Sequence, residues 1–138
     1  MRIVLDASTL VPAALKPGSI PDQVFLDAIG AFNRLIVSQA VEDEYREVLL
    51  RPKFDRFVPA DRRLRVVAIA VNAAERVEPR AEIRDCSDPK DSRYLSLAFD
   101  GRADVIVSSD QRHLLPMHPW RGISIVSPAD YLRMRLRA

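Results

Sequence analysis

Four acidic side chains stand where a strand ends or where a helix presents its inner face, and they are Asp6, Glu44, Asp91 and Asp110. Asp6 follows an apolar run at residues 3–5, and Asp110 follows shortly after a second run at residues 105–107. Both carboxylates should therefore lie beyond the carboxyl end of a buried strand, the edge at which open α/β sheets bind ligands. The arrangement suggests one shared divalent-metal site.

The elements that must position these residues alternate between short β-branched runs and helical periodicity, which favours a mainly parallel sheet of about four to five strands covered by helices. Strands are predicted at residues 2–6, 35–37, 76–77, 104–108 and 123–126. Helices are predicted at about 21–32, 38–50, 64–74, 89–100 and from 128 onward, with short helical turns at 12–17 and 54–57. Ser38 and Ser127 are the expected N-caps of two of these helices. The fold class is α/β.

The helix expected at residue 89 places Asp91 on the same face as the apolar stripe of Tyr94, Leu95 and Ala98. A purely local account makes Asp88 the N-cap and Asp91 an N3 residue that favours the helix dipole. The metal hypothesis instead points Asp91 toward the sheet edge. Gly101 is predicted to end this helix in the αL conformation.

Glu44 cannot be separated from Glu42 by periodicity, because the two glutamates flank the same apolar face of the helix at 38–50. A run of acidic residues on one helix is ordinarily a solvated face. The helical pattern leaves both alternatives open.

Length and composition predict one domain spanning residues 1–138, because 48% of the residues are apolar and the chain is too short for two ordinary cores. A formal charge of +2 excludes a polycationic coat but is compatible with a local basic surface. One cysteine, Cys86, and the absence of an apolar run of bilayer length lead us to expect a soluble, cytoplasmic protein without a membrane partner.

Several other polar and aromatic residues have ordinary interpretations. A basic series in the middle of the chain favours a solvated face over a phosphate-binding one, and it comprises Arg51, Lys53, Arg56, Arg62, Arg63 and Arg65. The same ambiguity applies to the series Arg133, Arg135 and Arg137. Trp120 and Tyr131 are expected to pack. His113 is expected on a loop surface, and no nucleophile motif accompanies it.

Four short segments together resemble the PIN-domain nucleases, and more narrowly their VapC-like toxin branch. These segments are Ile3–Ser8 (IVLDAS), Ser38–Tyr45 (SQAVEDEY), Asp88–Leu95 (DPKDSRYL) and Ala103–Asp110 (ADVIVSSD). Their order and approximate spacing match the family over nearly the whole chain. The resemblance implies a three-layer α/β/α PIN-like (Rossmann-like) domain, and it selects Glu44 over Glu42.

The resemblance also implies a function. It makes Asp6, Glu44, Asp91 and Asp110 the residues that hold Mg²⁺, or alternatively Mn²⁺, and it places Ser8 and Ser108 near the site. It implies an RNA substrate, a small antitoxin protein as partner and a homodimer. Two departures stand out: Ser92 replaces a common Asn after the third acid, and Ser109 replaces a common Gly before the fourth.

The chemistry fits this assignment, because clustered carboxylates repel one another and need a cation or protons to offset their charge. Mg²⁺ prefers such hard oxygen ligands. The leading hypothesis is a divalent-metal-dependent endoribonuclease, the toxin of a type II toxin–antitoxin pair, with one or two ions. Alternatives are a non-catalytic PIN-like module that binds RNA or protein, and an aspartate-dependent phosphatase with Asp6 as nucleophile. For Ser8, capping of the helix after the first strand is an equal alternative.

Overall fold

Five parallel strands form one sheet in the computed structural model, which describes residues 1–137 and, at the carboxyl end, the side chains as far as residue 135. Their order is β3-β2-β1-β4-β5. The strands are β1 (Arg2–Leu5), β2 (Arg34–Val37), β3 (Glu75–Arg76), β4 (Val105–Val107) and β5 (Ser124–Val126). Every neighbouring pair is parallel, so all five carboxyl ends lie at one edge.

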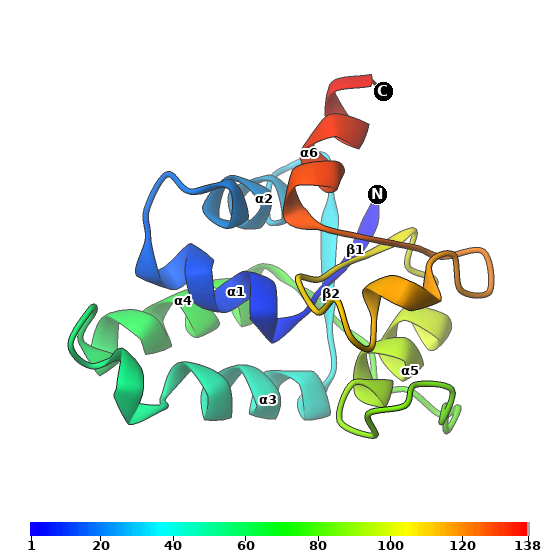
Figure 1. The fold of residues 1–138 in the computed structure, drawn as a ribbon, viewed down its shortest axis with the longest axis horizontal. Coiled ribbons are helices and arrows are strands. Elements are labelled where there is room, and N and C mark those ends of the chain that lie inside the picture. Colours follow the sequence, from blue (N-terminus) through cyan, green and yellow to red (C-terminus); the bar gives the residue numbers. More distant parts are fainter. Residues whose placement is uncertain (138) are drawn as a thin grey trace.

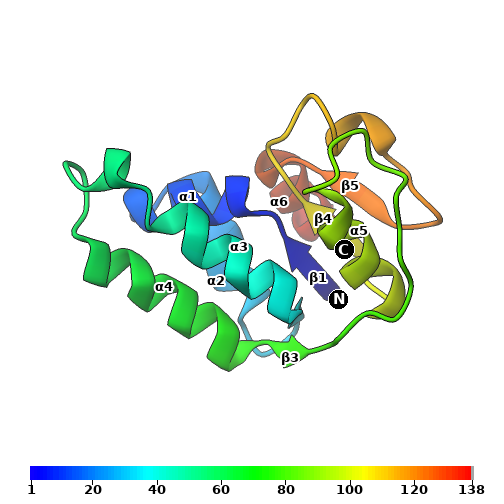
Figure 2. The same cartoon turned by 90° about the horizontal axis from the view of Figure 1, so that it is seen from below.

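Helices cover both faces of this sheet, which confirms the predicted α/β class (Figures 1 and 2). They are α1 (Ala7–Leu15), α2 (Ile20–Ala28), α3 (Gln39–Leu49), α4 (Ala60–Ala73), α5 (Ser92–Asp100) and α6 (Pro128–Arg137), with 3₁₀ turns η1 (Pro52–Phe54) and η2 (Leu115–Met117). In Figure 2, α1, α2, α3 and α4 lie together on one side of β1, while α5 lies on its other side.

The apolar residues of β1 and β4, in the middle of the sheet, are fully buried. Ile3, Val4 and Leu5 of β1 and all three residues of β4 are completely buried. A strand that is apolar at every position, rather than at alternate ones, is typical of a parallel sheet covered on both faces. The chain passes outward from β1 to β2 and β3 on one side of the sheet, and then crosses back to β4 and β5 on the other side of β1. The topological switch point between β1 and β4 therefore lies where Asp6 and Asp110 emerge.

Several helices differ from the sequence prediction: α2 ends earlier, α4 begins earlier at Ala60, and α1 and α5 differ near the acidic residues. The turn predicted at 12–17 belongs to a full nine-residue helix, α1, which contains Pro12. Helix α5 begins at Ser92 instead of residue 89, with Asp91 at the N-cap position and no side-chain cap. The capping interpretation of Asp91 is therefore wrong. Asp88 instead closes a separate turn, in which its carboxylate accepts a hydrogen bond from the Lys90 amide.

The serine caps were predicted correctly. Ser38 Oγ accepts a hydrogen bond from Val41 N at 3.2 Å, and Ser127 Oγ accepts one from Asp130 N at 3.1 Å. Each satisfies an amide at the start of its helix that has no intrahelical partner. Helix α2, by contrast, ends at Ala28, and Phe32 beyond it is 88% exposed.

Gly101 is needed for a different reason than the one predicted. Its φ is −82°, so the αL stop expected there is absent, and the residue with positive φ is Arg102 at 54°. A Cβ at position 101 would lie 2.4 Å from Ile36 Cδ1 and 2.7 Å from the Leu97 carbonyl oxygen. Glycine therefore allows α5 to approach β2.

Within the described residues, no helix combines the length and the apolar character that crossing a bilayer requires.

Candidate metal centre

Asp6 is held at the end of β1 by contacts that orient its side chain. Its amide donates to the Val107 carbonyl at 3.0 Å, which extends the pairing of β1 with β4. Its carboxylate is only 5% exposed, and Oδ2 accepts hydrogen bonds from Ser8 Oγ at 2.8 Å and Ser108 Oγ at 2.6 Å. Two hydroxyl donors on one oxygen fix the plane of the carboxylate and leave Oδ1 for another partner.

The same two serines tie β1 to the turn after β4. Ser8 Oγ accepts from Ser109 N, and Ser108 Oγ accepts from Asp110 N, both at 2.9 Å. Helix α1 has no side-chain cap, so the capping alternative for Ser8 is wrong. Ser109 is exposed and its φ is not positive, so the turn does not require glycine. This departure from the family pattern does not disturb the backbone.

Asp110 and Asp91 come together opposite Asp6. Asp110 Oδ1 accepts hydrogen bonds from the Arg112 and His113 amides, at 3.0 and 3.1 Å. Burial raises the pKa of Asp91 to about 8, and a hydrogen bond to Asp110 and the charges of Asp6 and Asp110 act in the same direction. Burial opposes ionisation of Asp110 too, but the hydrogen bonds from Asp91 and the two amides outweigh it and lower its pKa. Without a cation, the raised pKa of Asp91 and the lowered pKa of Asp110 therefore favour one proton held between the two carboxyl groups, on the side of Asp91.

Negative charge at this edge is not compensated by cationic side chains. Burial raises the pKa of Asp6 despite its two serine donors. In the part of the chain that the structure describes, no ion pair includes Asp6, Asp91 or Asp110. Repulsion among the three carboxylates therefore favours protonation or a bound cation.

This electrostatic arrangement predicts an unusual pH dependence of stability. The pKa of Asp91 is raised in the folded state, so the folded state binds the proton more tightly than the unfolded state, and the free energy of unfolding should fall as pH rises from about 4 to about 8. We expect thermal unfolding in EDTA to show a lower Tm at pH 8 than at pH 5. The Asp91→Asn variant should lose most of this difference, and an equal fall in both proteins would contradict the assignment.

Glu44 is already paired with an arginine of α5. Arg93 Nη1 of α5 contacts Glu44 Oε2 at 3.1 Å, and the Glu44 side chain is 12% exposed. Burial raises the pKa of the Tyr94 hydroxyl, and the charges of Asp6 and, to a smaller extent, Glu44 act in the same direction. Glu44 and Asp6 thus both lie near one buried phenol.

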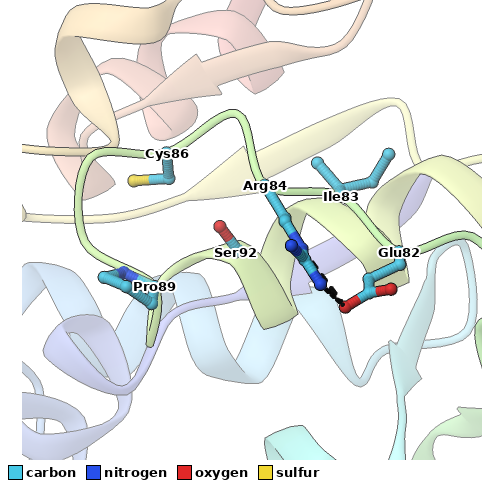
Figure 3. Close-up of a pocket in the computed structure, with 6 residues that line it drawn as sticks. All are labelled: Glu82, Ile83, Arg84, Cys86, Pro89 and Ser92. Atoms are coloured by element: carbon cyan, nitrogen blue, oxygen red, sulfur yellow. Dashed lines mark hydrogen bonds and ion pairs between the residues drawn. The ribbon is translucent and has the colours of Figure 1, made fainter.

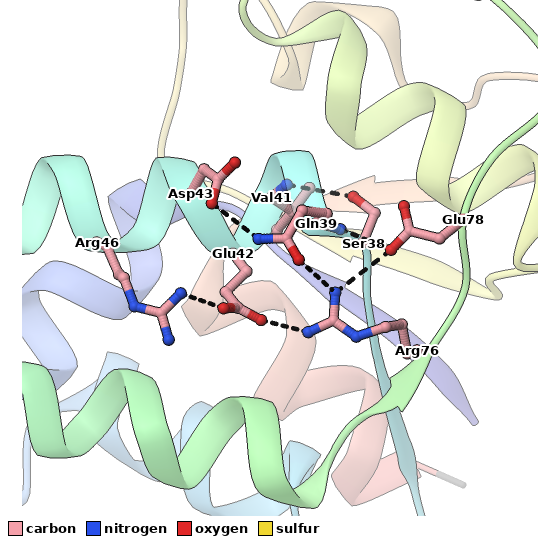
Figure 4. Close-up of polar contacts among 8 residues, drawn as sticks. All are labelled: Ser38, Gln39, Val41, Glu42, Asp43, Arg46, Arg76 and Glu78. Atoms are coloured by element: carbon pink, nitrogen blue, oxygen red, sulfur yellow. Dashed lines mark hydrogen bonds and ion pairs between the residues drawn. The ribbon is translucent and has the colours of Figure 1, made fainter.

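Glu42 has a different environment, which the helical pattern could not distinguish (Figure 4). Its carboxylate is 6% exposed and is bound by both Arg46 and Arg76. The hydrogen bond from Arg46 and that from Arg76 hold the pKa of Glu42 below its usual value. Glu42 therefore joins α3 to β3 and is neutralised there.

Two buried tyrosines beneath the site were not predicted to contribute to it. Tyr45 OH donates to the Leu5 carbonyl at 2.5 Å, and Tyr94 OH accepts from the Ala7 amide at 3.2 Å. These contacts hold the backbone on both sides of Asp6. In the sequence both tyrosines merely belong to apolar helical stripes, and nothing marks their hydroxyls as partners of β1.

Among the predictions for the other polar and aromatic residues, the one for Arg63 is wrong and the one for Trp120 is confirmed. The prediction that Arg63 belongs to a solvated or phosphate-binding face is wrong, because its side chain is buried and donates to backbone carbonyls. Trp120 packs as expected, with Nε1 donating to Asp85 at 2.9 Å. Arg133 and Arg135 pair with Asp130 and Asp27, while the side chain of Arg137 lies outside the described part of the chain.

The sequence matches the family model described as PIN domain over residues 2–112. The chain belongs to the PIN-domain family. A chain of the crystal structure of VapBC2 from Rickettsia felis bound to a DNA fragment from their promoter has the same fold, with a TM-score of 0.62 at 13% identity. The superposition covers 92% of this PIN domain and 98% of that chain. No curated protein matches the sequence.

The acidic residues of this PIN domain suit a hard divalent cation. All the donors are carboxylate oxygens, and the raised pKa values of Asp6 and Asp91 mark charge that a cation would offset. Within residues 1–137, no three His, Cys, Asp or Glu side chains already stand close enough to enclose an ion. Mg²⁺ keeps several waters and uses only a few protein ligands, so it does not require such an enclosure.

Proposed function

We propose that this PIN domain is a divalent-metal-dependent endoribonuclease that hydrolyses RNA phosphodiester bonds. The observation that supports it is the convergence of Asp6, Asp91 and Asp110, without any cationic partner, at the switch point of the sheet. RNA as the substrate follows from the resemblance to VapC-like toxins. The proposed ion is Mg²⁺, with Mn²⁺ as an alternative that accepts the same ligands.

Each acidic residue has a role in this proposal. Asp6, Asp91 and Asp110 would hold the cation, with the Asp6 carboxylate oriented by Ser8 and Ser108. Binding would require the proton shared by Asp91 and Asp110 to leave. Glu44 would complete the set, and Arg93, which now pairs with it, would be available to contact a phosphate oxygen of the RNA. The chemistry that the bound cation supplies is polarisation of phosphate oxygens and activation of water.

The biological setting that we propose is a type II toxin–antitoxin pair in the cytoplasm. The similarity in fold to a chain of VapBC2 supports a small antitoxin protein as partner. A homodimer as a further assembly follows only from the resemblance to VapC-like toxins. In this setting a segment of the antitoxin covers the acidic edge and places a cationic side chain near the uncompensated carboxylates. Such a contact would satisfy the same charge that the metal offsets.

Cleavage of labelled RNA tests the proposed activity. We expect the purified protein to cut single-stranded or structured RNA in Mg²⁺ or Mn²⁺ and to stop in excess EDTA. Restoring the metal after EDTA should restore cutting, which separates metal removal from denaturation. If the folded, metal-saturated protein binds RNA from a broad panel but cuts none of it, the non-catalytic alternative is correct.

A further inference from the structure

A pocket of about 410 Å³ opens beside the acidic edge, between the loop at residues 82–89 and the first turn of α5 (Figure 3). Its lining residues are Glu82, Ile83, Arg84, Cys86, Pro89 and Ser92. Ile83, Cys86 and Pro89 provide apolar walls. A pocket of this size with mostly apolar walls and a few polar groups is typical of a site for a small ring system.

Ser92 gives the pocket an unsatisfied polar group. The residue is 8% exposed, and within the described chain its Oγ is the one buried side-chain polar atom without a hydrogen-bond partner. In Figure 3 this hydroxyl points into the space that the loop encloses. Buried hydroxyls nearly always have partners, so this one is available to bond to a water or to a ligand that enters the pocket. A hydroxyl can both donate and accept, and so can match either kind of group on a ligand.

The pocket adjoins the carboxylates. Ser92 directly follows Asp91, and the charges of Asp91 and Asp110 reach the Cys86 thiol, whose pKa burial and these charges raise. The loop is also tied to the turn after β4, because Ser87 Oγ lies 2.9 Å from His113 Nδ1. A strand of RNA with a phosphate at the carboxylates would therefore have a neighbouring base within reach of the pocket.

The rim carries a charged pair that suits the same ligand. Arg84 contacts Glu82 at 2.6 Å, and the two side chains are 81% and 76% exposed. An exposed guanidinium plane can stack on a base while the base edge forms hydrogen bonds deeper in the pocket. Apolar walls, one deep hydroxyl and a stacking group at the rim together match an unstacked nucleobase.

We propose that this pocket receives one nucleobase of the RNA beside the scissile phosphate and gives the protein a preference at that base. The inference rests on the proposed function for its substrate class. Ser92 Oγ bonds to the base edge, and Arg84 covers the exposed face. The pocket is thus a specificity subsite, separate from the residues that hold the metal.

Binding of short RNAs tests this inference without cleavage. Single-stranded hexamers that differ at one central base would be titrated with Mg²⁺ into the Asp6→Asn protein, and the amide signals would be followed by NMR. We expect signals from residues 83–92 to shift and one base to bind at least about threefold more tightly than the others, as a single hydrogen bond allows. Ser92→Ala should remove this preference, whereas Ser124→Ala on β5, outside the pocket, should keep it.

Folding controls keep the result interpretable. Ser92→Ala removes a hydroxyl that has no partner, so its Tm should equal or exceed that of the parent protein. Arg84→Ala, at an exposed position, should weaken binding to all four hexamers, and Arg133→Ala on α6 should not. Absence of binding, equal affinity for all bases, or shifts confined to other residues would overturn the inference.

Two outcomes distinguish failure of the base-subsite proposal from failure of the nuclease proposal. Wild-type cleavage with Mg²⁺ at the same positions in Ser92→Ala would leave the nuclease standing and remove the subsite. Base-selective binding at residues 83–92 without any cleavage by the wild type would support the subsite and contradict the nuclease proposal.

Discussion

Asp6→Asn and Asp91→Asn are each expected to lower kcat for RNA cleavage by at least about a hundredfold. Loss of a residue that merely orients a metal ligand costs 10–100-fold in many metalloenzymes, and loss of a ligand should cost more. Both substitutions keep the size of the side chain and remove the negative charge. Initial rates at saturating Mg²⁺ on one labelled RNA would measure the effect.

The matched control is Asp43→Asn. Asp43 is exposed on α3, next to Glu44 in sequence, and contacts only Gln39 among the described side chains. Its rate should stay within about twofold of the wild type, because an exposed charge is screened. Equal losses in Asp43→Asn and Asp6→Asn would show that the rate depends on overall charge and not on the proposed ligands.

Arg63→Met is expected to lower the free energy of unfolding by about 3 kcal/mol, because it leaves the Leu49 and Val58 carbonyls without a donor and removes the pairing with Asp55. Arg63 is 1% exposed, and its guanidinium donates to the carbonyls of Leu49 at 2.5 Å, Arg51 at 3.2 Å and Val58 at 3.0 Å. It also pairs with Asp55. These contacts tie α4 to the end of α3 and the following turn. Thermal unfolding should show a Tm lower by on the order of 10 °C.

Arg62→Met and Arg65→Met are the controls, since both residues are exposed on the same helix. Each should change the stability by less than about 0.5 kcal/mol, as surface substitutions usually do. A wild-type Tm for Arg63→Met would mean that water or another donor satisfies the Leu49 and Val58 carbonyls.

The strand ends of the site were predictable from sequence because their signal is local. An apolar run followed by Asp6, and another followed by Asp110, predicts buried parallel strands with carboxylates at one edge. The structure places both residues at the switch point between β1 and β4. Caps at Ser38 and Ser127 were predictable for the same reason, since each depends on the next three residues alone.

Other features depend on partners distant in the sequence. Glu42 and Glu44 flank one apolar stripe, and what separates them is Arg76 on β3 and Arg93 on α5. Asp91 satisfies local capping rules, yet its environment is set by Asp110 and Asp6. Arg63 is one of several arginines in a basic series, and no local pattern shows that this one is buried. Tertiary contacts decide all three cases.

Anomalous diffraction from crystals soaked in Mn²⁺ tests the central claim most directly, because it locates the ion without reference to activity. The account predicts a peak at the carboxyl ends of β1 and β4, contacted by Asp6 and by at least one of Asp91 and Asp110. Asp6→Asn crystals treated identically should show a weaker peak or none. A wild-type peak elsewhere, or no peak at saturating Mn²⁺ and pH 8, would contradict the assignment of these carboxylates as the metal centre.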